Sequence, residues 1–487
     1  IVVKGFGPDR KEIASNKFIG KLVDVVALES SDLHGIYEIN GEAVVFISQA
    51  ITNRNTLVAL RFNAQTGNLI EEHQVATSPS FQRKNTYSLV RNTVNGGYAV
   101  FCMKDLVANP RETLNLLVFD DEHKVVRDIP VTVDVKEYDY TKHVSTSIGN
   151  DGGIAVFLDC IKIIHYPDDN DHFITTCYLA PGDTAFSNVM TKLPKQIGPL
   201  YGTYTYNEFS KTLNVLLVNA TTVVRTAGFR ALSEIIYSPF MLMYSKSNLA
   251  DMKFSPVKHE IANKQLRDAT DTTKYTEPVP LRIYTNKYGV NTIISEENKQ
   301  NVRFPNGNTA GSYIGNIVVT KVGEDGREIW SETLPKSQYL LYVMPADHLH
   351  RRGSHKFLFR REQPESDWLY QFSSFYSLET PNGDCYVIYN DLQSNFNHTL
   401  SDTPDPVSSY TGNNNITNAS AICYKVTARR QSTKQYLLDG IQTEISPGSV
   451  MIEGCDYNEK ANTFAGLFYL LENDVPTLRL GWVKLDE

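Results

Sequence analysis

One short pattern recurs along the chain at a constant interval, and it restricts the fold more than any other feature. One or two glycines in a turn precede an apolar run typical of a strand, at Gly41, Gly97 and Gly153. Two intervals of 56 residues separate these glycines. A period of about 40–55 residues made of strands and turns is typical of β-propeller blades. Gly97 and Gly153 are expected at positive φ in hairpin turns, where glycine has little steric cost. The chain is therefore predicted to be all-β and to fold as a single closed β-propeller.

The glycine turns and strand pairs predict seven blades, with eight as the alternative. The predicted blades span 35–77, 85–133, 142–193, 200–260, 280–338, 371–440 and 445–487. Polar insertions interrupt the pattern near 339–370 and 393–418, and the second forms a long polar loop. The last blade is one strand short. Either Ile1 to Val3 or the segment 22–28 is expected to complete it, because a propeller leaves no long sheet edge exposed.

The charge and hydropathy of the chain exclude two classes of partner. The formal net charge is −8, and no basic run is longer than two or three residues. Nucleic-acid binding depends on clustered Lys and Arg that release counterions from phosphates, so it is not expected here. No stretch approaches the 18 or so consecutive apolar residues of a transmembrane helix. The sequence therefore predicts neither a nucleic-acid partner nor a transmembrane segment, and it leaves the oligomeric state open.

The first residue and the cysteines bear on localisation. The chain begins with Ile1 and not with Met, as expected where a signal peptide has been removed. The six cysteines lie singly in or near predicted strands and have no CxxC spacing. Buried structural thiols are favoured, and one or two disulfides are the alternative. Both alternatives fit a bacterial periplasm, so a periplasmic, cell-surface or secreted location is expected.

A resemblance to known proteins extends over residues 314–395. It is carried by Asp325-Gly326, Trp330, the segment 334–338, Ser373-Ser374-Phe375, the segment 386–391 and Asn395. In these residues the chain resembles uncharacterised secreted or cell-envelope β-propeller-like proteins of Gram-negative bacteria. The resemblance implies a propeller fold and a location outside the cytoplasm. It implies no reaction and no cofactor.

The strongest local motif is the segment Tyr389, Asn390 and Asp391, which ends a predicted strand. Amide and carboxylate oxygens at that position can point into a propeller channel and hold a ligand or a cation. The alternative is structural, with Asp391 accepting hydrogen bonds from backbone N–H groups at the strand end. The structural role is favoured, and ligand binding by the three residues is kept as a hypothesis.

Two other clusters have the residue types of metal sites. Asp347, His348, His350 and His355 can supply imidazole and carboxylate ligands for zinc or a similar ion. Two arginines that follow His350 would repel a cation, so a solvated loop is favoured. The segment 168–172, Asp-Asp-Asn-Asp-His, is acidic enough for calcium but lacks the glycine and the glutamate of an EF-hand loop. An acidic hairpin turn is favoured there.

No catalytic motif stands out. The chain has no GxSxG, HExxH or Walker sequence, and Gly5-Phe6-Gly7 lacks the third glycine of a dinucleotide loop. The sequence therefore identifies neither catalytic residues nor a cofactor. Asn-x-Ser/Thr triplets, which matter mainly on a eukaryotic secretory route, are expected to be incidental; they begin at Asn219, Asn397, Asn415 and Asn418.

Three functions remain in competition. The leading hypothesis is a non-catalytic binding or scaffold propeller of the bacterial cell envelope, with a glycan or an envelope protein as partner. The alternative is a carbohydrate-active hydrolase with acidic residues at the channel mouth, where the carboxylate separation would decide the mechanism. The third is a metal-dependent hydrolase that uses the three histidines of the 339–370 insertion.

Overall fold

A computed structural model gives the fold of this protein. It describes residues 2–6, 12–18, 20–23, 31–51, 54–77, 85–104, 114–131, 138–165, 169–193, 199–227, 230–270, 277–303, 310–323, 325–340, 357–358, 371–410, 413–414, 418–438, 448–459, 461–472 and 475–485. The chain divides into two compact units. Unit 1 comprises residues 1–204 and 351–362, and unit 2 comprises 205–350 and 363–487. In the described part of the chain, no helix is long and apolar enough to cross a membrane.

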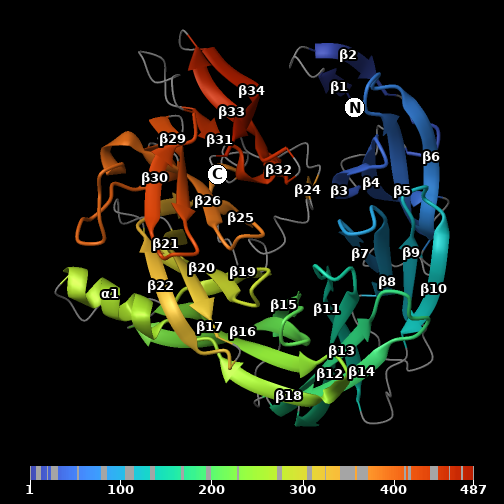
Figure 1. Ribbon diagram of the computed structural model, residues 1–487, viewed down its shortest axis with the longest axis horizontal. Coiled ribbons are helices and arrows are strands. Elements are labelled where there is room, and N and C mark those ends of the chain that lie inside the picture. The colour runs from blue at the N-terminus through green and yellow to red at the C-terminus, as the bar shows by residue number, and fades with distance from the viewer. Residues whose placement is uncertain are drawn as a thin grey trace. The chain divides into compact units, whose positions relative to one another are not determined.

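Unit 1 holds three sheets that each contain four consecutive antiparallel strands (Figure 1). The first consists of β3 (Asp32–Ile39), β4 (Glu42–Ile51), β5 (Arg54–Asn63) and β6 (Leu69–Thr77), with the short β24 (Phe357–Leu358) added beside β3. The second consists of β7 (Asn85–Arg91), β8 (Tyr98–Lys104), β9 (Leu114–Phe119) and β10 (Val125–Val131). The third consists of β11 (Tyr140–Ile148), β12 (Ile154–His165), β13 (Asp169–Leu179) and β14 (Ser187–Lys192).

Four more sheets follow. The fourth consists of β15 (Pro199–Asn207), which crosses the unit boundary, β16 (Thr212–Ala227), β17 (Arg230–Ser245) and β18 (Asn248–Pro256). The fifth consists of β19 (Val279–Thr285), β20 (Asn291–Arg303), β21 (Ala310–Val322) and β22 (Glu328–Leu334). The sixth consists of β25 (Phe375–Glu379), β26 (Cys385–Leu392), β29 (Ala419–Val426) and β30 (Ser432–Tyr436). The seventh consists of β31 (Ser449–Val450), β32 (Asp456–Asn458), β33 (Thr463–Glu472) and β34 (Val475–Lys484). In this last sheet β31 and β32 both pair with β33. The prediction of an all-β, seven-bladed propeller is confirmed.

The 393–418 insertion is partly built into the fifth sheet. A 3-10 turn, η5 (Gln393–Asn395), begins the insertion, and β27 (Val407–Tyr410) and β28 (Asn413–Asn414) follow. β27 pairs in parallel with β23 (Gln338–Leu340), which itself pairs with β21. The polar loop expected from composition therefore contributes strands at the end of the fifth blade.

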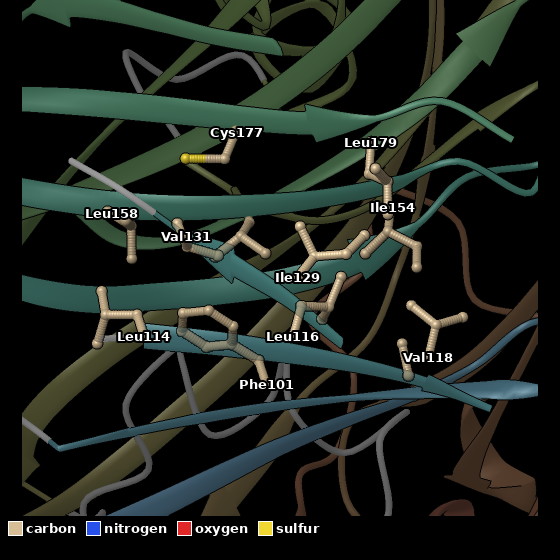
Figure 2. Packing of buried hydrophobic residues seen from close by; sticks show 12 residues of the cluster. Phe101, Leu114, Leu116, Val118, Ile129, Val131, Ile154, Leu158, Cys177 and Leu179 are labelled. Carbon is tan, nitrogen blue, oxygen red and sulfur yellow. The ribbon is translucent and has the colours of Figure 1, made fainter. Parts of the chain in front are cut away.

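Apolar side chains fill the space between neighbouring blades. In unit 1, Phe101, Leu116 and Ile129 of the second blade pack against Ile154 and Leu158 of the third, and all five are nearly or fully buried. Figure 2 shows these side chains pointing toward one another between the strands. Branched and aromatic residues are favoured in such positions because they pack well on a pleated surface. Because these side chains are buried only where two blades pack together, each repeat needs a neighbouring repeat.

A single side-chain amide also joins neighbouring blades at their first turn. In unit 1, Asn92 Nδ2 donates to the carbonyl of Gly152 at 3.2 Å, from the second blade to the third. In unit 2, Asn207 Nδ2 donates to the carbonyl of Gly289 at 2.8 Å, from the fourth blade to the fifth. The oxygen of each amide accepts backbone N–H groups of its own turn, such as Val94 N at 3.0 Å. We call this contact the Asn–Gly clasp.

Among the described residues, the strand that begins at Val2 does not complete the last blade as expected. β1 (Val2–Phe6) pairs with β2 (Glu12–Lys17) in a separate two-stranded sheet. The chain then reaches the outer strand of the first blade, where the Glu72 carboxylate accepts the backbone N–H groups of Lys21 and Leu22, each at 2.6 Å. The expectation for the first strand is therefore wrong, and residues 24–28 lie outside the described part of the chain.

The expected positive φ falls one residue earlier than predicted in both glycine pairs. Gly96 has φ 80° and Gly152 has φ 75°, whereas Gly97 and Gly153 are not in this region. At Gly97 and Gly153 it is instead the lack of room for a side chain that requires glycine. A Cβ at Gly97 would overlap the carbonyl oxygen of Phe119, and one at Gly153 would lie 2.7 Å from the Tyr178 ring.

Replacing Gly153 with Val is expected to lower the free energy of unfolding by about 1–3 kcal/mol, because the new side chain must displace a packed tyrosine ring. Thermal melts of the Gly153→Val variant measure the effect. Gly182→Asn is the matched control, since Gly182 has positive φ but nothing within 4 Å of the Cβ position, and Asn tolerates that backbone. Equal melting temperatures for Gly153→Val and the parent would contradict the assigned packing.

One helix, α1 (Glu260–Thr270), connects the fourth and fifth blades and contacts β22. The Glu328 carboxylate of β22 accepts the Ile261 N–H at 2.8 Å, which satisfies a free donor in the first helical turn. Ala262 and Leu266 are buried. The sequence did not predict this helix, because 11 residues offer only three turns of periodicity.

His259, immediately before α1, is expected to make stability depend on pH. Burial lowers its pKa from 6.5 to about 4. The unfolded chain therefore takes up this proton first, and stability is lost as the pH falls from about 6.5 to about 4, by up to about 3 kcal/mol. Urea titrations of the parent and of His259→Gln across this range measure the difference. Parallel pH profiles for the two proteins would rule out His259 as the source.

None of the six cysteines forms a disulfide. Five are buried and Cys102 is partly buried. Burial raises the pKa of the Cys102 thiol to about 12, so it stays protonated at neutral pH. The cysteines pack as small apolar side chains in the structure, which is the alternative favoured from the sequence.

Candidate functional site

The central hairpin of the fifth blade extends beyond its neighbour. β19 pairs with β20 as far as Glu296, and β20 then continues against β21 alone. The sequence of β20 changes there from Ile293-Ile294 to seven consecutive polar residues, 295–301. The first four of these, 295–298, are buried. Each polar group in a buried strand needs a hydrogen-bonding or ionic partner. This end of the blade is therefore the candidate site.

A β-bulge places Glu297. On β20, Glu296 pairs with Ile317 and Asn298 with Ile314, so two residues of β21 lie opposite Glu297. One of them is Gly315, where a Cβ would overlap Oε2 of Glu297. Only glycine leaves room for the carboxylate at this position. Bulges of this kind commonly redirect a side chain beside a functional site.

Four side chains form the group that we call the Glu297 cluster: Glu297, Lys299, Tyr313 and Tyr339. Lys299 Nζ lies 2.6 Å from the Glu297 carboxylate; the Lys299 side chain is 56% exposed and that of Glu297 is 9% exposed. The two tyrosine rings contact each other with centroids 5.1 Å apart, and Lys299 Nζ lies 5.8 Å from the Tyr313 centroid. The cluster combines a nearly buried carboxylate, an exposed ammonium and two aromatic rings.

Burial, and then the nearby Glu297 carboxylate, raise the pKa of the Tyr313 phenol. The phenol therefore stays neutral at pH 7 and keeps its proton. Glu297 and Lys299 are two positions apart on β20, so both side chains point to the same face of the strand. Tyr313 is the direct cross-strand partner of Lys299. Rigid strands, and not loops, thus position the cluster.

The same end of the fifth blade is bonded to the fourth blade. Gln300, next to Lys299, donates from Nε2 to the hydroxyl of Tyr237 on β17 at 2.8 Å. Tyr237 is 9% exposed. The contact fixes the extended part of β20 to its neighbour.

A fully buried ion pair lies on the opposite face of β20. Lys336 Nζ is 2.8 Å from the Glu296 carboxylate, and their side chains are 1% and 0% exposed. Ser374 Oγ donates to the second oxygen of Glu296 at 2.7 Å. Ser374 has φ 66°, which is uncommon for a residue other than glycine. Burying two charges is costly unless they are paired and hydrogen-bonded, and this trio meets that condition.

The buried network continues into the sixth and seventh blades. Gln338 accepts the Ser374 N–H at 2.8 Å and donates to the Asn390 carbonyl at 3.0 Å. The Asn390 amide donates to the carbonyls of Phe372 and Val450, each at 2.7 Å, and accepts the Val450 N–H at 2.8 Å. Both atoms of the Asn390 amide are therefore used by backbone groups.

The three residues of the 389–391 motif are buried. Tyr389 is 0% exposed and donates to the Pro335 carbonyl at 2.8 Å. Asp391 accepts the Leu392 N–H at 2.9 Å and the Asn395 amide at 2.7 Å, and burial raises its pKa. These contacts are of the structural kind. Ligand binding by Tyr389, Asn390 and Asp391 stays a prediction, and the Glu297 cluster contains none of them.

The candidate metal ligands are not brought together in the described part of the chain. Asp347, His348, His350 and His355 lie outside the described residues. Within the residues that are described, no group of three or more His, Cys, Asp and Glu side chains is placed to hold a metal ion.

Residues 169–172 of the acidic segment are the first four of β13, so they lie in a strand and not in the hairpin turn expected for them, and Asp168 lies outside the described residues. Asp171 is paired with Lys192 at 3.0 Å, and His172 with Asp159 at 3.0 Å. The two residues are thus engaged by protein partners. Asn219, the first of the Asn-x-Ser/Thr positions, is 0% exposed and so is not presented on the surface.

No protein family and no curated protein matches the sequence. The chain is similar to several solved structures. Polysaccharide lyase Uly1 is 11% identical, with a TM-score of 0.40 over 93% of this chain and 90% of that chain. An ulvan lyase of family PL25 is 9% identical, with a TM-score of 0.40 over 93% and 91%. An α-L-arabinofuranosidase from Fusarium graminearum is 8% identical, with a TM-score of 0.36 over 82% and 93%. At this level of likeness, function has to be inferred from the chain's own residues.

Proposed function

We propose that this protein acts on a carbohydrate and that the Glu297 cluster holds the sugar unit. One observation carries the proposal: a carboxylate–ammonium pair, 2.6 Å apart and with its ammonium exposed, lies beside two tyrosine rings on paired strands. Aromatic faces pack against the apolar faces of sugar rings, and a few fixed polar groups orient the hydroxyls. The proposal rests on this cluster and not on the names of similar structures.

The cluster also has the groups needed for proton transfer. Glu297 can accept a proton, either from an attacking water or from the sugar, and the neutral Tyr313 phenol can donate one to the departing oxygen. Hydrolysis by two carboxylates would need a second one about 5–10 Å away. Glu296 is adjacent but fully buried and paired with Lys336. The described residues of the cluster thus favour a Glu–Tyr pair over the two carboxylates of the hydrolase alternative.

The test is to incubate the full chain with a panel of neutral and uronate-containing polysaccharides. Cleavage is expected for at least one of them. New reducing ends alone indicate hydrolysis, and ultraviolet absorbance of an unsaturated uronate indicates elimination. Tyr339→Leu keeps an apolar side chain but removes the flat ring, and about 10-fold weaker retention in a polysaccharide gel is expected, equivalent to ~1.4 kcal/mol. Retention without cleavage would favour the non-catalytic binding propeller instead, and neither retention nor cleavage of any polysaccharide would remove the proposal.

A further inference from the structure

Two aromatic side chains stand out at the other end of the same blades. Phe209 is 74% exposed and Tyr288 is 62% exposed, the highest fractions among large hydrophobic residues in the described part of the chain. Tyr288 lies in the turn between β19 and β20, where Thr285 pairs with Asn291. Glu297 lies six residues further along β20, which corresponds to about 20 Å. The two aromatics are therefore remote from the Glu297 cluster.

Both aromatics are held in fixed turns. Asn207 accepts the Phe209 N–H at 3.0 Å, and Asn286 accepts the Tyr288 N–H at 2.9 Å. The Asn–Gly clasp between Asn207 and Gly289 joins the two turns directly. At Gly289, which has φ 78°, a Cβ would lie 2.8 Å from Cβ of Phe209. The two exposed side chains thus sit on adjoining turns in a prearranged geometry, which lowers the entropy lost on binding.

Polar groups adjoin the rings. Lys287 Nζ lies 5.1 Å from the Tyr288 centroid and donates to Asn382 Oδ1 of the next blade at 2.7 Å. On the other turn, Lys211 and Glu208 form an exposed pair at 2.8 Å. Exposed rings flanked by ammonium and amide groups match the alternating apolar and hydroxyl surfaces of a sugar polymer.

The size of the patch argues against a second protein as occupant. Two aromatic side chains at these exposures offer roughly 300 Å² together. A stable protein interface needs about 800 Å² on each partner. A narrow polymer needs far less contact area on each unit. We infer that Phe209 and Tyr288 form a second glycan-binding surface, which retains the polysaccharide independently of the Glu297 cluster; the identity of the ligand rests on the proposed function.

The experiment compares Phe209→Ser/Tyr288→Ser with the parent protein. The probe is whichever polysaccharide of the panel the parent retains or cleaves, together with short oligosaccharides made from it. Retention in a gel containing the polymer is expected to weaken about 10- to 100-fold, while turnover of the short oligosaccharides is unchanged. Ile329→Ser is the matched control, because Ile329 is a 47% exposed apolar residue on the outer strand β22.

The outcomes separate this inference from the proposed function. Unchanged retention by the double variant overturns the inference and leaves cleavage at Glu297 standing. If the double variant loses retention and the parent cleaves no polysaccharide, the second glycan-binding surface is supported and the catalytic role of the Glu297 cluster is not. The parent could instead sediment as a dimer and the double variant as a monomer, with equal retention of the polysaccharide by both. That result overturns the inference and makes the patch an interface between copies of the chain. If the parent retains no polysaccharide, the inference falls as well.

Discussion

Lys336→Met is expected to lower the free energy of unfolding by about 3–5 kcal/mol. This is a larger loss of stability than the one expected for Gly153→Val. The change removes the ammonium that pairs with the Glu296 carboxylate, in a site where both side chains are essentially without solvent contact. A charge left unpaired in such a place costs several kcal/mol. Chemical denaturation of the parent and the variant measures the difference.

Two controls make this result specific. Lys211→Met removes an ammonium from an exposed ion pair in the same unit, and the melting temperature is expected to stay unchanged because water replaces the partner. Lys336→Met combined with Glu296→Leu removes both buried charges and is expected to recover part of the loss. If the double variant is no more stable than Lys336→Met, the penalty does not come from an unpaired carboxylate.

Glu297→Gln is expected to lower kcat/KM on the cleaved polysaccharide by about 10²–10⁴-fold, the range typical of losing a general base. The variant keeps the shape of the side chain and its place over Gly315, so the fold is expected to persist. Circular dichroism and thermal melts check this point. Measurement of the rate across pH shows whether one ionising group has been removed.

Glu122→Gln is the matched control for this variant, because Glu122 also pairs with a nearby lysine, Lys124, on an exposed turn. Activity at the parent level is expected for the control. Tyr313→Phe removes only the phenolic hydroxyl and is expected to lower turnover more than binding. Parent-like activity of both Glu297→Gln and Tyr313→Phe would place the chemistry elsewhere in the chain.

The blades could be predicted from sequence because their signal is local. Each glycine turn lies within a few residues of the apolar run that follows it, and this short pattern recurs after 56 residues. The error at Gly97 and Gly153 has the same local origin. In a Gly-Gly pair either residue can adopt positive φ, and the local sequence does not distinguish the two. The lack of room for a side chain at Gly97 and Gly153 comes from the Phe119 carbonyl and the Tyr178 ring, which belong to later strands of the same sheets.

The candidate site could not be predicted in the same way, because its contacts span long stretches of sequence. Lys336 is 40 residues from Glu296, and Ser374 is 78 residues from it. A local signal was nevertheless present: seven polar residues in a row follow two isoleucines in β20. In contrast, the motif at 389–391 was visible as a strand ending in polar residues, but its partners Pro335, Asn395 and Val450 depend on the fold.

The Asn–Gly clasp has a consequence for how such a chain can change over evolutionary time. Each clasp uses a donor on one repeat and a backbone carbonyl on the next, at Asn92 with Gly152 and at Asn207 with Gly289. The acceptor is a main-chain atom, which every residue carries. A duplicated repeat would therefore arrive with the donor for its successor and an acceptor for its predecessor already in place. The contact keeps a glycine on the accepting side, because φ is positive at both Gly152 and Gly289. It offers a way for repeats to be gained while their other side chains diverge.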